Sequence, residues 1–221
     1  RWTPLYHPQT WNQPSNVSRE MTVTGNGEIA AEPDYVQIQV EVRTQGQEVS
    51  TAQQENAQIM NRVIGSLMAL NIPREDIQTA HYSISPMYDY IDGRQVFRGY
   101  EVQNAITVKI MDISQAGIVI DTAVLNGANQ VSEIQFKIED TAVYYRQALR
   151  LALVDAHAKA GAMAETMHLS IQPIPIEIIE ERNLAVPYSF KSVQVSNQES
   201  MTPIEQGTML INATVRVKYR Y

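Results

Sequence analysis

The sequence predicts the same order of secondary-structure elements twice: strand, helix, strand, strand. Apolar and polar residues alternate with a period of two in the strands, whereas the helices repeat their apolar residues every three to four positions. The first copy has a strand at 35–43, a helix near 50–70 and strands near 77–90 and 96–110; the second has a strand at 134–139, a helix near 141–169 and strands near 171–181 and 206–221. Strands with one apolar face build an antiparallel or mixed sheet that is covered on one side. We therefore predict an α+β fold, in which two long helices and one short helix cover one face of the sheet.

The ends of the repeat suggest how the chain is organised. Prolines among Gln, Asn and Ser predict a flexible tether over residues 1–19, left by a removed leader or by trimming of the chain. We expect residues 20–221 to form one domain, with a first unit at about 20–110, a linking helix at about 111–128 and a second unit at about 129–221. The sequence leaves open whether the strands form one sheet or two, and the short helical link favours one continuous layer.

Several local motifs make sharper predictions. Gly25-Asn26-Gly27 is typical of a turn after a short strand at 21–24, and Asp92-Gly93 is typical of a hairpin turn. Ser50 and Gln53 have the spacing of a capping box at the start of the first long helix. Alternation fails at about 183–205, which predicts a long loop, and loops of that length are usually functional or mobile.

The second long helix carries an alanine at every fourth position. These residues are Ala148, Ala152, Ala156, Ala160 and Ala164. Such a row allows a neighbouring backbone to approach closely, so we interpret it as core packing. The helical phase of Met60, Met163 and Met167 also predicts core positions for these three methionines.

Composition excludes several classes of function. The chain has 221 residues, 44% of them hydrophobic, which is enough to bury a core. A net charge of −7 argues against a general nucleic-acid binder, and no window approaches the roughly 18 apolar residues of a membrane-spanning helix. The absence of cysteine excludes thiol nucleophiles, disulfides and thiolate metal sites.

The remaining chemistry-bearing residues do not form an active-site pattern. His157 and His168 point the same way on one predicted helix, but at 1.5 Å per residue they lie about 16 Å apart, too far to share a metal ion. Glu165 and His168 have the spacing used in carboxylate-bridged metal bundles, but a second such pair is missing from the sequence. No G-x-S-x-G elbow occurs. We predict no catalytic residues, no cofactor and no metal, and keep a hydrolase or metalloenzyme as the weakest hypothesis.

Two features suggest contacts instead. The predicted hairpin at 82–100 is rich in aromatic residues, which are favoured at interfaces; they are Tyr82, Tyr88, Tyr90, Phe97 and Tyr100. Arg216, Lys218 and Arg220 form a basic stripe on one face of the last strand. We expect this stripe to pair with an acidic strand of the same chain, and a neighbouring chain is the alternative.

Several motifs in this order resemble the SIMPL domain family, also called DUF541. They begin with TVTGNGE at 22–28 and Glu32-Pro33-Asp34, followed by alternating valines. Asn71-Ile72-Pro73, Ser85-Pro86 before a Tyr-rich hairpin, and Gly99-Tyr100 continue the likeness, as do the alanine-rich helix and the last strand. The likeness covers about 20–221. It departs at 204–207, where IEQG replaces the Pro-Gly-Glu turn that members often have.

The resemblance implies a bacterial protein carried across the inner membrane, with no accepted catalytic mechanism. Some members form ring-like or channel-like oligomers, and the family has been connected with stress tolerance. We therefore predict an extracytoplasmic, non-enzymatic homo-oligomer, whether periplasmic, at the cell surface or secreted, with contacts from sheet edges, the aromatic hairpin and the 183–205 loop. The alternative is a monomeric binding module that holds a peptide or a small ligand between helices and sheet.

Overall fold

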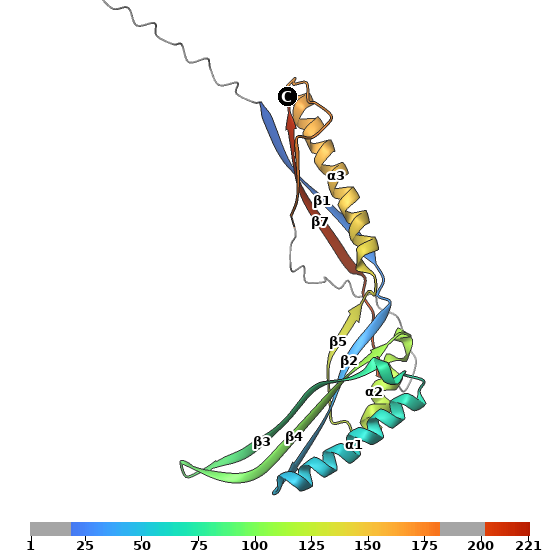
Figure 1. Ribbon diagram of the computed structural model, residues 1–221, viewed down its shortest axis with the longest axis vertical. Coiled ribbons are helices and arrows are strands. Elements are labelled where there is room, and N and C mark those ends of the chain that lie inside the picture. Colours follow the sequence, from blue (N-terminus) through green and yellow to red (C-terminus); the bar gives the residue numbers. More distant parts are fainter. Residues whose placement is uncertain (1–18, 182–201) are drawn as a thin grey trace, which may run out of the picture. The chain divides into compact units, whose positions relative to one another are not determined.

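The computed structural model describes residues 19–181 and 202–221 and confirms the α+β prediction (Figure 1). The α-helices are α1 (Val49–Ala69), α2 (Ala116–Leu125) and α3 (Thr141–Thr166), with 3-10 helices η1 (Arg74–Asp76) and η2 (Ile113–Gln115). The strands are β1 (Glu20–Ala31), β2 (Tyr35–Gly46), β3 (Ile77–Ile91), β4 (Arg94–Ile110), β5 (Gln130–Lys137), β6 (Glu177–Glu181) and β7 (Met209–Arg220). Residues 1–18 and 182–201 lie outside the described residues; they include all but the last residue of the tether predicted at 1–19 and most of the loop predicted at about 183–205.

The strands form two sheets, so the prediction of one continuous layer is wrong. One sheet has the order β3-β4-β2-β5 and the other has the order β1-β7-β6. Strand pairing does not follow the two copies of the repeat. β5, the first strand of the second copy, pairs antiparallel with β2 of the first copy, and β1, which precedes both copies, lies beside β7 of the second. Residue pairs Arg19–Tyr221 and Asn26–Thr214 show that β1 and β7 are also antiparallel.

The chain contacts divide the molecule into two compact units. Of the described residues, unit 1 comprises 19–29, 143–181 and 211–221, and unit 2 comprises 30–142 and 202–210. Each unit therefore holds one sheet, and each has its own apolar core. The single domain expected over 20–221 stays a prediction.

The core of unit 2 is built from large side chains. The even-numbered residues of β2 and β4 from Val36 and Val102 onward face α1 and α2, and α1 contributes Met60, Val63 and Leu67. Because β2 alternates strictly, its odd-numbered residues lie on the opposite, polar face. The predicted core position of Met60 is confirmed.

The core of unit 1 is built from small side chains. All five alanines of the row on α3 are buried, with relative exposures of 0–3%, and α3 lies along β1 and β7 (Figure 1). β1 runs without a turn through Gly25, Asn26 and Gly27, so the predicted turn there is wrong. A Cβ at Gly25 would lie 2.0 Å from the Ala152 carbonyl oxygen, and one at Gly27 would lie 2.0 Å from that of Ala148. These glycines are therefore required by the close approach of strand and helix.

Three smaller predictions also differ in outcome. The hairpin turn at Asp92-Gly93 is confirmed, since both residues have positive φ, as in a type I′ turn. The capping box is wrong: α1 begins at Val49 after Glu48, and no side chain caps it. The core positions predicted for Met163 and Met167 are wrong. These side chains are 47% and 66% exposed, because α3 buries little beyond its alanine row.

Candidate functional site

The candidate site is the far end of the ribbon formed by β3 and β4, which projects away from α1 in Figure 1. β2 ends at Gly46, opposite Tyr100, so residues 94–99 of β4 pair only with β3. At this branch point the backbones approach closely: Gly99 has φ +143°, and a Cβ there would lie 2.7 Å from the Gly46 carbonyl oxygen. Beyond it the sheet is two-stranded, and two-stranded hairpins are marginally stable on their own in water.

The strand register places the predicted aromatic residues on one face. Tyr82 lies opposite Asn104 and Ile84 opposite Val102, on the same side of the sheet as the core. Alternation carries this side through Tyr88, which lies opposite Phe97. We call the set Tyr82, Tyr88, Tyr90, Phe97 and Tyr100 the aromatic face. It continues the apolar face of the sheet past the end of its helical cover.

The aromatic face is exposed and internally ordered. Tyr88 and Phe97 meet edge to face with ring centroids 5.8 Å apart, and Phe97 and Tyr100 do so at 5.2 Å. Tyr82, Tyr88 and Phe97 are each 44–45% exposed, Tyr90 is 76% exposed and Tyr100 is half-buried. These edge-to-face contacts restrict the rings of Tyr88, Phe97 and Tyr100, so these three side chains lose less conformational freedom when a partner binds.

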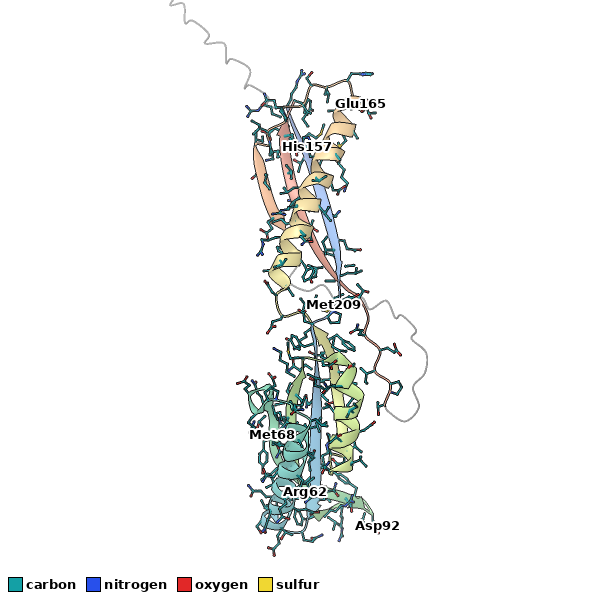
Figure 2. All side chains as sticks on the ribbon, turned by 90° about the vertical axis from the view of Figure 1, so that its right-hand side faces the viewer. Arg62, Met68, Asp92, His157, Glu165 and Met209 are labelled. Carbon is teal, nitrogen blue, oxygen red and sulfur yellow. The ribbon has the colours of Figure 1, made fainter. Side chains whose placement is uncertain are left out.

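The opposite face of the ribbon is mixed. It carries Ser83, Ser85 and Asp89, and Asp89 lies 3.7 Å from Arg98 in an exposed ion pair. Met87, Ile91 and Val96 lie on the same side, and Ile91 and Val96 are 56% and 44% exposed. The two faces therefore differ mainly in that the aromatic side chains gather on one of them. Asp92 marks the tip of the ribbon in Figure 2.

The sequence analysis missed one member of this surface. Ile84 is 36% exposed and lies between Tyr82 and Tyr88 on the same face. The signal was present, because residues 82, 84, 86 and 88 alternate with polar neighbours except at Met87.

The sheet edges differ in how open they are. In unit 1, α3 covers the edge of β1: Asp155 accepts a hydrogen bond from the Asn26 backbone N–H at 2.8 Å, and Lys159 donates one to the Thr24 carbonyl at 3.0 Å. Lys159 and Asn26 together hold the pKa of Asp155 below its ordinary value. β3 is an edge strand of unit 2, interrupted by Pro86, which has no donor to offer a neighbour.

Two of the three residues of the basic stripe on β7, Arg216 and Lys218, are paired within the chain; the pairing of Arg220 stays a prediction. Lys218 lies 2.7 Å from Glu177 of β6 and 3.9 Å from Glu20 of β1, and Arg216 pairs with Glu181. The hydrogen bond to Glu177 raises the pKa of Lys218. These pairs join the three strands of unit 1 across their exposed face.

A polar cluster on the outer face of unit 2 has a structural explanation. Arg43 donates to Glu41, which raises the pKa of Arg43 and pairs a carboxylate that is only 5% exposed. Gln103 and Gln45 donate to Glu101 and lower its pKa. Asn129 bonds both backbone groups of Arg43 and so fixes the start of β5.

The histidines are not brought together as a metal site. Nδ1 of His157 lies 3.4 Å from the Tyr219 hydroxyl oxygen, and burial raises the pKa of Tyr219. Over 19–181 and 202–221, no group of three or more His, Asp or Glu side chains is placed to hold a metal ion. Within the same residues no helix is long and apolar enough to cross a bilayer. The absence of a cofactor and of catalytic residues stays a prediction.

Comparison with known proteins places the chain among relatives of unknown function. The family described as "Protein of unknown function (DUF541)", SIMPL, matches residues 21–219. A "26 kDa periplasmic immunogenic protein" of Brucella melitensis is 24% identical over 218 residues, covering 94% of this chain and 87% of the relative, and its Brucella abortus counterpart matches equally. "Uncharacterized protein YggE" of Escherichia coli K12 is 23% identical over 154 residues, covering 70% of this chain and 63% of the relative.

Proposed function

This chain belongs to the SIMPL family (DUF541), and on that premise we propose that it is an extracytoplasmic protein that acts by self-association rather than by catalysis. The assembly is a ring-like or scaffold oligomer, in which the aromatic face of the β3–β4 ribbon contacts a second copy. Its role is in the tolerance of envelope stress, as the family resemblance implies.

One observation carries the proposal: one face of a two-stranded ribbon presents aromatic side chains, three of them in edge-to-face contact, with no cover among the described residues. Tyr and Phe are enriched where protein surfaces meet, and ordered rings reduce the entropy lost on binding. A partner that covers this face would also stabilise a ribbon that is otherwise marginal. A second copy is the partner chosen because the protein is acidic overall and Arg216 and Lys218 of its basic stripe are already paired, which disfavours a partner held by charge.

The test is the absolute mass in solution, measured by light scattering on a sizing column at two protein concentrations. We expect a mass several times 24.9 kDa that falls in the double variant Tyr88→Ser, Tyr90→Ser. Ser83→Ala, Ser85→Ala changes the opposite face of the same strand and should leave the mass unchanged. A wild-type monomer at both concentrations would exclude self-association and favour the alternative of a monomeric module for a peptide or small ligand.

The location rests on a different line of support. A Brucella relative carries the name of a periplasmic protein, and the likeness to it extends over 94% of this chain. Fractionation of cells that produce the natural full-length protein should place it outside the cytoplasm. Recovery with cytoplasmic markers would contradict this part of the proposal and leave the assembly untouched.

A further inference from the structure

The outer side of α3 carries a second surface, separate from the ribbon. Six exposed residues recur at alternating steps of four and three; they are Gln147, Leu151, Val154, Ala158, Gly161 and Glu165. We call them the outer stripe. A 4-3 repeat places side chains in one line along a helix and is the spacing of a helix–helix seam. At 1.5 Å per residue the stripe is about 27 Å long.

Most of the stripe lies opposite the buried alanine row, where packing within unit 1 does not account for it. Val154 is 66% exposed; Leu151, at the edge of the stripe beside Gly27 of β1, is still 45% exposed. Gly161 is exposed within α3, five residues before the helix ends, where glycine is a poor helix former, and a Cβ there would meet nothing within 4 Å. Gly25 and Gly27 are explained by contact with α3, whereas Gly161 has no such explanation among the described residues.

The order of residues along the stripe is self-complementary in the antiparallel sense. If two copies of α3 cross a two-fold axis level with Ala156, Leu151 of one lies opposite Gly161 of the other, and Val154 lies opposite Ala158. Each large side chain then faces a small residue, which is how helices interdigitate. A parallel pair would instead set Leu151 against Leu151 and Gly161 against Gly161.

Charge agrees with the same orientation. The antiparallel pair places Glu165 level with Gln147 of its partner and within one turn of Arg150, which flanks the stripe. Over residues 19–181 and 202–221, neither Glu165 nor Arg150 has an ion-pair partner within 4.0 Å. A parallel pair would bring like charges together. Figure 2 labels Glu165 near the C-terminal end of α3, where the repeat ends.

We propose that α3 is a two-fold contact with a second copy of this chain, formed by antiparallel pairing of the two outer stripes. Six residues a side are fewer than the about 20–30 of a standard interface. The contact is therefore weak and concentration-dependent, and it strengthens when another contact holds the two copies together. It does not rest on the ribbon contact.

Cysteine cross-linking tests the orientation directly, because the chain has no cysteine of its own. The full-length variants Val154→Cys and Ala158→Cys are mixed, one of them isotope-labelled, and oxidised under mild conditions. We expect mass spectrometry to find the mixed 154–158 disulfide formed several-fold faster than either like pair. Leu151→Cys with Gly161→Cys should behave the same way. Like pairs forming as fast as mixed ones, or no pair forming faster than Gly65→Cys with itself, would overturn the proposal.

A filling variant gives a second readout. Gly161→Leu should lower the association constant by about tenfold or more, because it removes the space for the partner's Leu151. Gly65→Leu is the matched control, since Gly65 is an exposed helical glycine of α1 where a Cβ would likewise meet nothing within 4 Å. Sedimentation velocity is run in the Tyr88→Ser, Tyr90→Ser background, so that loss of the ribbon contact and loss of the α3 contact are told apart. Equal association of the two leucine variants would overturn the proposal.

Discussion

The two units of the molecule use the same elements, a helix on an antiparallel sheet, but pack them in opposite ways. In unit 2, α1 and α2 meet the sheet through large side chains such as Ile38, Val63 and Leu67, all fully buried. In unit 1, α3 meets β1 through glycine and alanine, and backbone nearly touches backbone. A contact between large side chains can adjust to a substitution by small changes in side-chain conformation, whereas a contact between backbones cannot.

This difference decides which side chains remain available on the surface. Because α3 buries only a narrow alanine row, residues such as Leu151 and Val154 stay exposed on its far side. α1 buries a wider stripe, and in unit 2 the exposed aromatic residues lie on the ribbon beyond the helix. The packing of each unit thus affects which apolar side chains stay exposed.

The largest expected effect is that of a single methyl group on β1. Gly25→Ala should destabilise unit 1 by more than about 3 kcal/mol, because the new Cβ meets the backbone oxygen of Ala152 and the helix must move. Chemical denaturation gives the size, and hydrogen exchange should rise in β1, β7 and α3 while unit 2 stays protected. Gly65→Ala is the matched control; it should be neutral or stabilise by up to about 1 kcal/mol. Equal stability of the two variants would show that small-residue packing is as tolerant as large.

The converse change in unit 2 should have a slightly smaller effect. Leu67→Ala removes a fully buried side chain and should cost about 3 kcal/mol through lost burial and the cavity left behind. Exchange should then rise in unit 2 and not in β1 or α3. Met68→Ala, on an exposed neighbour labelled in Figure 2, is the control and should change stability by less than about 0.5 kcal/mol. Equal loss of protection in both units would contradict the division into two cores.

Within the described residues, unit 2 also differs from unit 1 in that its core contains a buried side-chain amide, that of Asn56. Nδ2 of Asn56 donates to the carbonyls of Val42 at 2.9 Å and Val102 at 3.3 Å, while Oδ1 has no partner among the described residues. Asn56→Asp removes both donors and buries a carboxylate, so we expect a loss of about 2 kcal/mol at pH 7. Burial raises the folded-state pKa of the new acid, so the loss should shrink as the pH falls toward the unfolded value of about 3.9.

The control for this variant is Asn61→Asp on the exposed side of the same helix. It should leave the free energy of unfolding within about 0.5 kcal/mol of wild type, without the pH trend. Loss of stability at Asn61 equal to that at Asn56 would mean that negative charge on α1, rather than the buried amide, is responsible.

Local pattern predicted much of this fold, because alternation and helical phase depend on neighbouring residues alone. The strands β2, β4 and β7 and the alanine row of α3 follow from such patterns. Gly25 and Gly27 were misinterpreted because turn formation and close packing select the same residue. Their partners on α3 lie far away in sequence; the neighbouring contact of Asn26 with Asp155 spans 129 positions. The choice between one sheet and two is likewise set by long-range pairing of β1 with β7.

The candidate site was predictable in part for the same reason. Aromatic residues at 82, 88, 90, 97 and 100 mark the hairpin as a contact surface from sequence alone. What the sequence does not show is where along the sheet the helices stop covering its apolar face. That depends on Gly46, where β2 stops, and on Gly99, which lets the two backbones approach. Met163 and Met167 show the same limit, because helical phase does not say how wide a stripe the sheet will cover.

The smallest expected effect on stability concerns the edge of β1 and depends on the charge of Asp155. Asp155→Asn keeps an acceptor for the Asn26 N–H but loses the charge pairing with Lys159, 2.7 Å away. The pKa of Asp155 is lowered in the folded state, so its contribution is present above the ordinary value of 3.8 and is lost as the pH falls through the lowered pKa. The stability difference between wild type and variant should therefore be small at pH 7, shrink with added salt, and vanish in acid. Glu55→Gln on the exposed side of α1 is the control for loss of one carboxylate and should show no such acid transition. A difference that persists at low pH would show that the effect of the variant does not come from the carboxylate charge. No difference at pH 7 would show that β1 is held by packing against α3 alone, through the glycines and alanines of unit 1.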